Sequence, residues 1–151
     1  MVNNLVCDII NYINENINDK ISIEELTQEF NYNRYYIMKL FKRELDISII
    51  NYINCIRIYN SLNSLRSNNS ILNVALNNGF YSQEYYTEIF KKAVGTNPTT
   101  YKKFITQKYL STKKEEEIVL SNLIKLENTI IRVNTYKTKR RQDNNIKTIF
   151  R

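Results

Sequence analysis

Apolar residues recur along this chain at helical spacing, in segments separated by short polar breaks. The first segment carries Leu5, Ile9, Ile13 and Ile17 on a background rich in asparagine. A stripe at i, i+4 and i+8 is typical of an amphipathic helix that buries one face. The same pattern predicts helices, some with their capping residue included, at 5–17, 23–30, 34–45, 48–66, 70–77, 82–94, 97–104 and about 114–135.

Polar residues at the segment boundaries support these helices. Ser22 and Glu25 form the S-x-x-E pattern of a capping box, and Asn33, Ser48 and Ser82 are candidate N-caps before later segments. The whole chain has two glycines and one proline, too few for the turns of a sheet protein. The predicted fold class is therefore all-α.

Part of this pattern of helices and caps occurs twice along the chain, at 22–52 and again at 70–101. The second helix of each copy, at 34–45 and 82–94, is the outward helix of its unit. Ser22, Leu26, Thr27 and Tyr32 align with Ser70, Val74, Ala75 and Phe80 at an offset of 48, and Phe41, Lys42, Ser48 and Tyr52 with Phe90, Lys91, Asn97 and Tyr101 at 49. Two short helices joined by a tight turn form a helix-turn-helix unit. We therefore expect two such subdomains, at about 5–47 and 70–104, joined by a long linker helix at 48–66.

The repeated residues resemble the AraC/XylS family of bacterial transcription regulators over roughly Leu5 to Phe104. The most specific part is Ile71-Leu72-Asn73-Val74-Ala75-Leu76-Asn77-Asn78-Gly79-Phe80, followed by Ser82, Phe90-Lys91-Lys92, Gly95 and Pro98. The resemblance implies a double helix-turn-helix domain at 1–104 whose outward helices enter successive major grooves of double-stranded DNA. One turn of B-DNA, about 34 Å, is within reach of two units spaced by a helix of this length.

By position, the resemblance implies which side chains meet the DNA. Base contacts fall to Tyr35, Met38 and Lys39 of the first outward helix and to Gln83, Glu84, Thr87 and Glu88 of the second. Phosphate contacts fall to Asn33, Arg34, Lys42, Arg43, Ser82, Lys91 and Lys92. Lysine can donate to guanine, glutamine suits adenine, and a carboxylate can accept from cytosine N4.

The two carboxylates of the second outward helix depart from the family pattern, because Glu84 and Glu88 would repel phosphates. Either they read cytosines, or the second unit contributes little affinity. In contrast, Phe41, Phe90, Tyr52 and Tyr101 are expected in the core.

Composition narrows the class of protein further. The chain has no histidine, which removes the commonest general base and metal ligand, and no phosphate loop or metal-ligand cluster is present, so we expect neither an enzyme nor a cofactor. Cys7 and Cys55 have no metal-site spacing; a reduced, buried pair in a cytoplasmic protein is favoured over a disulfide. No apolar run reaches the roughly 20 residues that a membrane span needs. The chain begins almost at the first helix, as in small stand-alone regulators that have no sensing domain or small-molecule effector, although a fragment would look the same.

Residues 105–151 lie beyond the resemblance and hold most of the net charge of +7. Val119, Leu123, Leu126, Ile130 and Val133 are spaced 4, 3, 4 and 3, a heptad seam of barely two heptads. Packing back on the domain is favoured over dimerisation, so a monomer is expected. After about residue 135 we expect a mobile basic arm, which would either add salt-sensitive DNA affinity or keep the chain soluble.

Two hypotheses follow. The first is a sequence-specific double-stranded DNA-binding regulator that contacts or blocks RNA polymerase. The second is an interaction or antagonist protein that keeps the fold but acts through its C-terminal helix, with weak or no specific DNA binding. A gel shift at moderate salt separates them, since the second hypothesis predicts no specific shift.

Overall fold

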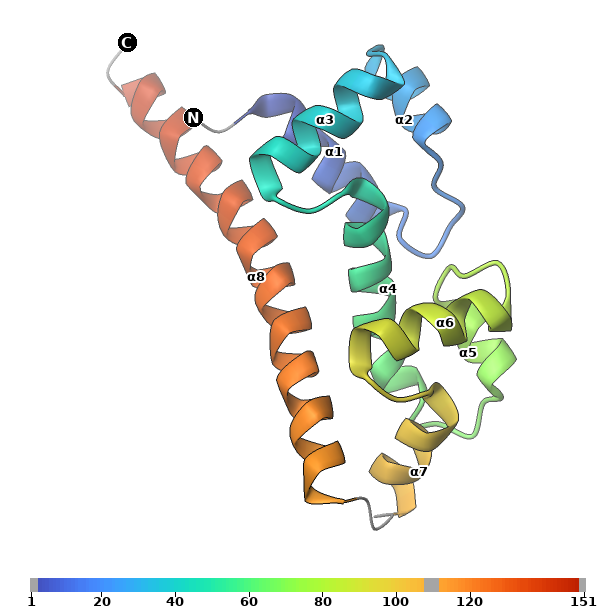
Figure 1. Ribbon diagram of the computed structural model, residues 1–151. Coiled ribbons are helices and arrows are strands. Elements are labelled where there is room, and N and C mark those ends of the chain that lie inside the picture. The colour runs from blue at the N-terminus through green and yellow to red at the C-terminus, as the bar shows by residue number, and fades with distance from the viewer. Residues whose placement is uncertain (1–2, 108–111, 150–151) are drawn as a thin grey trace. The chain divides into compact units, whose positions relative to one another are not determined.

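Helices account for nearly all of the residues that the computed structural model describes, 3–107 and 112–149, and this part of the chain contains no strand (Figure 1). The helices, in order, are α1 (Asn4–Glu15), α2 (Ile23–Phe30), α3 (Arg34–Leu45), α4 (Ile49–Ser64), α5 (Ile71–Asn77), α6 (Gln83–Val94), α7 (Pro98–Gln107) and α8 (Lys113–Ile149). The all-α prediction is confirmed, and α3 and α6 are the two outward helices.

The chain forms two compact units. Unit 1 comprises Met1–Ile53 with Ile130–Arg151, and unit 2 comprises Asn54–Thr129. In unit 1, α2 and α3 pack against each other and α1 packs on α3; in unit 2, α5 packs on α6 and α6 on α7. Each unit therefore contains one helix-turn-helix pair and the helix that supports it.

The predicted caps form and set the helix boundaries. The amide of Glu25 donates to the Ser22 hydroxyl at 3.1 Å, and the amide of Ser22 donates back to the Glu25 carboxylate at 3.4 Å. Asn31 ends α2 in the left-handed conformation, with φ of 57°. Because these signals are local, the bounds of α2 and α3 agree with the sequence to the residue.

Other helix ends differ from the sequence prediction. The first helix ends at Glu15 rather than at Ile17, since Asn16 leaves the helical conformation with φ of −115° and ψ of 19°. Its side chain then caps the end by donating to the Tyr12 carbonyl at 2.8 Å. The linker helix α4 ends at Ser64 rather than near Arg66. In contrast, α7 continues three residues past Phe104, through residues that include no glycine or proline.

Each unit has the same aromatic pair in its core. Phe41 of α3 and Tyr52 of α4 lie with ring centroids 5.8 Å apart, and Phe90 of α6 and Tyr101 of α7 lie 5.6 Å apart. None of the four is more than 6% exposed. The residues of the second pair follow those of the first by 49 positions, so the sequence repeat is a repeat of core packing, as predicted.

Unit 2 also buries polar groups in pairs. The Tyr86 hydroxyl donates to the Ser61 hydroxyl at 2.9 Å, and the ring is fully buried, which raises the pKa of Tyr86 to about 12. Nearby, the Asn54 side chain donates to the Tyr85 hydroxyl at 3.0 Å. A buried polar group that lacks a partner is costly, so these pairs fix how α4 and α6 face each other.

The last helix, α8, corrects one prediction. The sequence suggested an end near residue 135 and a mobile arm beyond it, but the helix continues to Ile149. Residues 136–149 contain no glycine or proline, and their lysines, arginines and glutamine are good helix formers. The predicted heptad seam packs against the chain itself: Val119 and Leu126 are buried in unit 2 and Val133 in unit 1.

Cys7 and Cys55 are both buried and no disulfide joins them, as the sequence indicated. Within the described residues, no helix is long and apolar enough to cross a membrane.

Candidate nucleic-acid interface

The first outward helix, α3, has a sharply divided surface. Ile37, Leu40 and Phe41 are buried, which turns the opposite face to solvent. That face carries the three predicted base-contact residues: Tyr35 is 73% exposed, Met38 is 37% exposed, and Lys39 is exposed beside them.

Lys39 and Tyr35 are already organised relative to each other. The Lys39 ammonium lies 5.5 Å from the centroid of the Tyr35 ring, a cation–π contact. Among the described residues Lys39 has no ion pair with a carboxylate. Its charge is therefore available to an acceptor outside the chain.

The second outward helix, α6, buries Tyr86, Phe90 and Val94. Its solvent face carries the predicted base-contact residues of unit 2, with Gln83, Glu84 and Glu88 exposed and Thr87 half-buried. The two sets of predicted residues thus lie on equivalent faces of equivalent helices, each within its own unit.

Glu88 does not face solvent as an isolated carboxylate. The Lys92 ammonium lies 3.1 Å from it, one turn further along the helix. The sequence raised the concern that two carboxylates on α6 would repel DNA, and this pair offsets one of them. Glu84 has no such cation among the described residues.

Several predicted phosphate-contact residues also have carboxylate neighbours. Arg34 lies 2.6 Å from Glu24, Lys42 3.8 Å from Asp46, and Arg43 3.4 Å from Glu44. Most of these side chains are well exposed, and exposed pairs contribute about 0–1 kcal/mol. Such contacts are weak enough for a phosphate to replace the carboxylate. Lys91 is exposed, and no ion pair joins it to another described residue.

The N-cap side chains are partly engaged. The Asn33 side-chain oxygen accepts from the amide of Tyr36 at 2.8 Å, and the Ser82 hydroxyl accepts from the amide of Tyr85 at 3.1 Å. The side-chain nitrogen of Asn33, Nδ2, and the hydroxyl proton of Ser82 take no part in these two bonds. Both caps can therefore still donate to a phosphate, as the sequence prediction requires.

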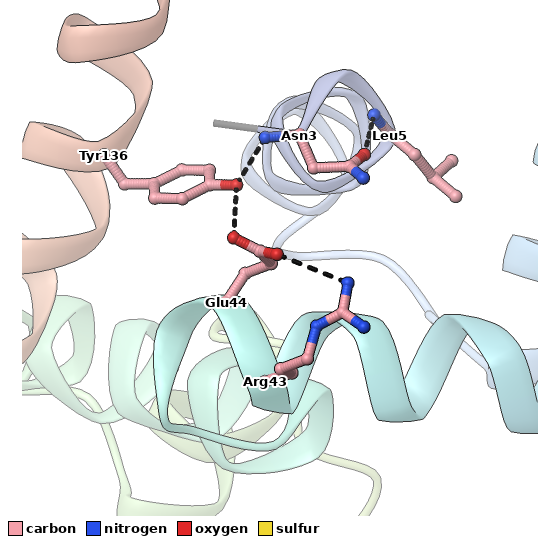
Figure 2. A network of polar contacts seen from close by, with 5 residues as sticks. All are labelled: Asn3, Leu5, Arg43, Glu44 and Tyr136. Atoms are coloured by element: carbon pink, nitrogen blue, oxygen red, sulfur yellow. Dashed lines mark hydrogen bonds and ion pairs between the residues drawn. The ribbon is translucent and has the colours of Figure 1, made fainter. Parts of the chain in front are cut away.

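A contact that the sequence did not indicate fastens α3 to α8 within unit 1 (Figure 2). The Tyr136 hydroxyl donates to the Glu44 carboxylate at 3.4 Å and accepts from the amide of Asn3 at 2.8 Å. The Arg132 guanidinium donates to the Leu45 carbonyl at the end of α3. Burial raises the pKa of Tyr136. The C-terminal helix thus holds the last turn of the outward helix.

Replacing Tyr136 with phenylalanine is expected to loosen this attachment while keeping the ring. The two hydrogen bonds lost are each worth about 0.5–1.5 kcal/mol, since both are only partly buried. Thermal unfolding should show the loss. Compared with the unchanged protein, amide hydrogen exchange should become faster at the end of α3 and stay the same at the end of α6. Thr138→Val, an exposed change on the same helix, is the control. If the substitution changed the exchange rate equally at the two helix ends, an anchoring role for the hydroxyl would be contradicted.

The fold and its exposed faces define a protein with two helix-turn-helix units. A model of a helix-turn-helix domain family matches residues 26–103, about half of the chain. The chain therefore belongs to the AraC-type family of helix-turn-helix proteins, as the sequence resemblance indicated.

Known relatives agree with this assignment. An uncharacterised HTH-type transcriptional regulator, YbfP of Bacillus subtilis, is 31% identical over 108 residues, which are 71% of this chain and 36% of that protein. The melibiose operon regulatory protein of Escherichia coli is 31% identical over 104 residues, 68% of this chain and 34% of that protein. The chain thus spans about a third of the length of these relatives. They are transcription regulators by name, not enzymes.

Solved structures share the fold. The C-terminal domain of AraT, a response regulator from Geobacillus stearothermophilus, matches with a TM-score of 0.64 and 24% identity over 74% of this chain and 91% of that one. The DNA-binding domain of AdpA, solved with a target DNA, matches with a TM-score of 0.61 and 18% identity over 66% of this chain and 91% of that one.

Proposed function

We propose that this protein is a sequence-specific double-stranded DNA-binding transcription regulator, in which α3 and α6 are the recognition helices. The observation that carries the proposal is the repeated outward face. Tyr35 and Lys39 are exposed on α3 at the places where Glu84 and Glu88 are exposed on α6. Family membership supports it, as does the similarity in fold to a domain that was solved with its target DNA.

The exposed side chains suit base recognition in the major groove. Lys39 on α3 can donate to guanine O6 and N7, and Gln83 on α6 can pair with adenine N6 and N7. Glu88, paired with Lys92, forms a site that can accept from cytosine N4 through its carboxylate while the ammonium approaches a phosphate. In this proposal α6 reads DNA, and the weak-second-unit alternative applies only if Glu84 repels the backbone.

The interaction-protein alternative rests on the two carboxylates of α6, Glu84 and Glu88, and on a nearly neutral domain, and it would act through the C-terminal helix. Burial of Val119, Leu126 and Val133 within the chain supports the first hypothesis over this one, although α8 also exposes Ile124 and Ile131. We accordingly propose a monomer with DNA as its main partner, located in the bacterial cytoplasm, and RNA polymerase as the protein it contacts or blocks. Residues 1–104 are proposed to form the DNA-binding domain, with 105–151 as an extension.

Selection of bound sites from random duplex DNA tests the proposal. Engagement of both recognition helices predicts a selected site with two conserved blocks one helical turn apart. A single block would mean that only one unit engages. Recovery of no preferred sequence at moderate salt would refute sequence-specific binding and favour the interaction protein.

Lys39→Ala should weaken binding to the selected site by about 1–3 kcal/mol and relax the preference at one base pair. The reason is that the lysine donates to a base edge as well as adding positive charge. Fluorescence anisotropy with the selected duplex and a random duplex measures both effects. Lys125→Ala, an exposed lysine of α8, is the matched control. An equal loss on both duplexes would show that Lys39 touches only phosphate.

A further inference from the structure

Both recognition helices begin with the same stacked pair of tyrosines, which the sequence repeat did not reveal. Tyr32 stacks on Tyr36 at the start of α3, with ring centroids 5.2 Å apart and planes at 22°. Tyr81 stacks on Tyr85 at the start of α6, with centroids 4.9 Å apart and planes at 19°. In each unit the first tyrosine precedes the N-cap and the second is the third residue of the helix.

The cap geometry explains why these rings meet. In each unit the N-cap side chain accepts from the amide of the second tyrosine, at 2.8 Å for Asn33 and 3.1 Å for Ser82. This bond folds the chain back on the first helical turn, so the residue before the cap lies beside the third helical residue. The stack is therefore a built part of the helix start rather than a chance contact.

Three of the four stacked tyrosines are exposed although they are aromatic, and Tyr85 is half-buried. Tyr81 is 78% exposed, Tyr32 46% and Tyr36 43%. Side chains with this much exposed surface gain less from burial than the core rings do, and their outer faces are open to a ligand. In unit 2 the stack also has support from below, because buried Asn54 donates to the Tyr85 hydroxyl and holds the ring on which Tyr81 lies. No hydrogen bond joins the hydroxyls of Tyr32, Tyr36 or Tyr81 to another described residue.

Charge along the recognition helices indicates what these rings meet. The last turn of each helix carries two basic residues, Lys42 and Arg43 in α3 and Lys91 and Lys92 in α6. At the other end, Arg34 is paired with Glu24, and the first turn of α6 contains Glu84. A helix in the major groove lies between two phosphate strands, so its first turn also needs donors. Neutral tyrosine hydroxyls can donate to phosphate there.

We propose that the tyrosine stacks at the starts of α3 and α6 are matched contacts to the DNA backbone. The exposed face of Tyr32 or Tyr81 packs on a deoxyribose, and its hydroxyl donates to the adjacent phosphate. The second tyrosine of each pair holds the first in position. The proposal rests on the proposed DNA-binding function and adds contacts that carry no sequence information of their own.

Tyr81→Phe, which removes only the hydroxyl, tests the phosphate bond in the full chain. A hydrogen bond to a charged group is worth enough that affinity should fall about tenfold. The fall should be equal on the selected duplex and on a random duplex, because a backbone contact reads no base. Tyr59→Phe, a 41% exposed tyrosine of α4 that belongs to neither stack, is the control and should bind as the unchanged protein does.

Tyr81→Trp tests contact directly, because the chain contains no other tryptophan. On addition of duplex, its emission should shift to shorter wavelength and its quenching by acrylamide should fall. Emission that stays constant while the gel shift shows binding would overturn the proposal and leave the proposed function standing. A loss for Tyr81→Phe on the selected duplex alone would also overturn it, since that marks a base contact. If the unchanged protein bound no duplex, the tyrosine proposal and the proposed DNA-binding function would both be refuted.

Discussion

Phe90→Ala should destabilise the protein by about 3–5 kcal/mol, the usual cost of deleting a fully buried phenylalanine ring. Phe90 is 0% exposed and lies against two other rings, Tyr86 at 5.6 Å and Tyr101 at 5.6 Å between centroids. The cavity left by alanine has little chance to close, because aromatic rings on both sides are held by helices.

Urea denaturation followed by circular dichroism measures this loss. Phe41→Ala is the matched variant in unit 1, since Phe41 is also 0% exposed and packs on Tyr52. If the repeat is one of core packing, the two variants should lose similar amounts. A loss below about 1 kcal/mol in either would show that the ring is not a core residue of its unit.

Gly95→Ala is expected to cost about 2–4 kcal/mol, from two separate effects. Gly95 ends α6 in the left-handed region with φ of 93°, where a side chain is strained. An added Cβ would also lie 2.8 Å from the Asn122 amide nitrogen and 3.0 Å from a methyl carbon of Ile118. The Asn122 side chain cannot simply move away without loss, because it donates to the Val94 carbonyl.

Asp46→Gly provides the reciprocal test at the equivalent place in unit 1. Asp46 ends α3 with φ of 54°, so here a residue with a side chain already bears the left-handed strain. Glycine should relieve that strain and stabilise the protein by up to about 1 kcal/mol, because the Lys42 pair that is lost is exposed. Thermal unfolding of the Gly95→Ala and Asp46→Gly variants measures both changes in stability. Opposite signs are expected, and two losses of similar size would contradict the strain argument.

Local signals in the sequence were sufficient for most of the fold. The capping box at Ser22 and the N-caps at Asn33 and Ser82 depend on residues three positions apart, so the order of residues alone is enough to recognise them. The repeated spacing of Phe41 and Phe90 likewise placed both cores. For the same reason the solvent faces of α3 and α6 were predictable, since a face is defined by what the other face buries.

Contacts between distant residues were not predictable. Tyr136 bonds with Asn3, 133 positions away, and Asn54 with Tyr85, 31 positions away. No periodicity encodes such partners. The end of α8 was mistaken because its basic residues suggested a solvated arm, whereas the attachment of Tyr136 and Val133 to unit 1 stabilises the helix that leads into it.

The carboxylates on α6 show that, in the candidate site too, sequence predicts exposure but not contacts. Sequence placed Glu84 and Glu88 correctly on the exposed face but treated them alike. The structure distinguishes them, because only Glu88 has a lysine one turn away and suitably oriented. The stacked tyrosines were missed because Tyr32 aligns with Phe80 rather than Tyr81 in the repeat, so the shared position relative to each N-cap was hidden by the inserted residue.

The composition of unit 1 bears on the order in which the chain folds during synthesis. Unit 1 needs residues from both ends of the sequence, whereas unit 2 is one continuous stretch from Asn54 to Thr129. During synthesis, every residue of unit 2 is therefore added to the chain before Val133 and Tyr136, which complete the packing of unit 1. Domains usually fold from the N-terminus onwards as they emerge. In this protein α3 is synthesised early, and the residues that complete its packing in unit 1 are synthesised later.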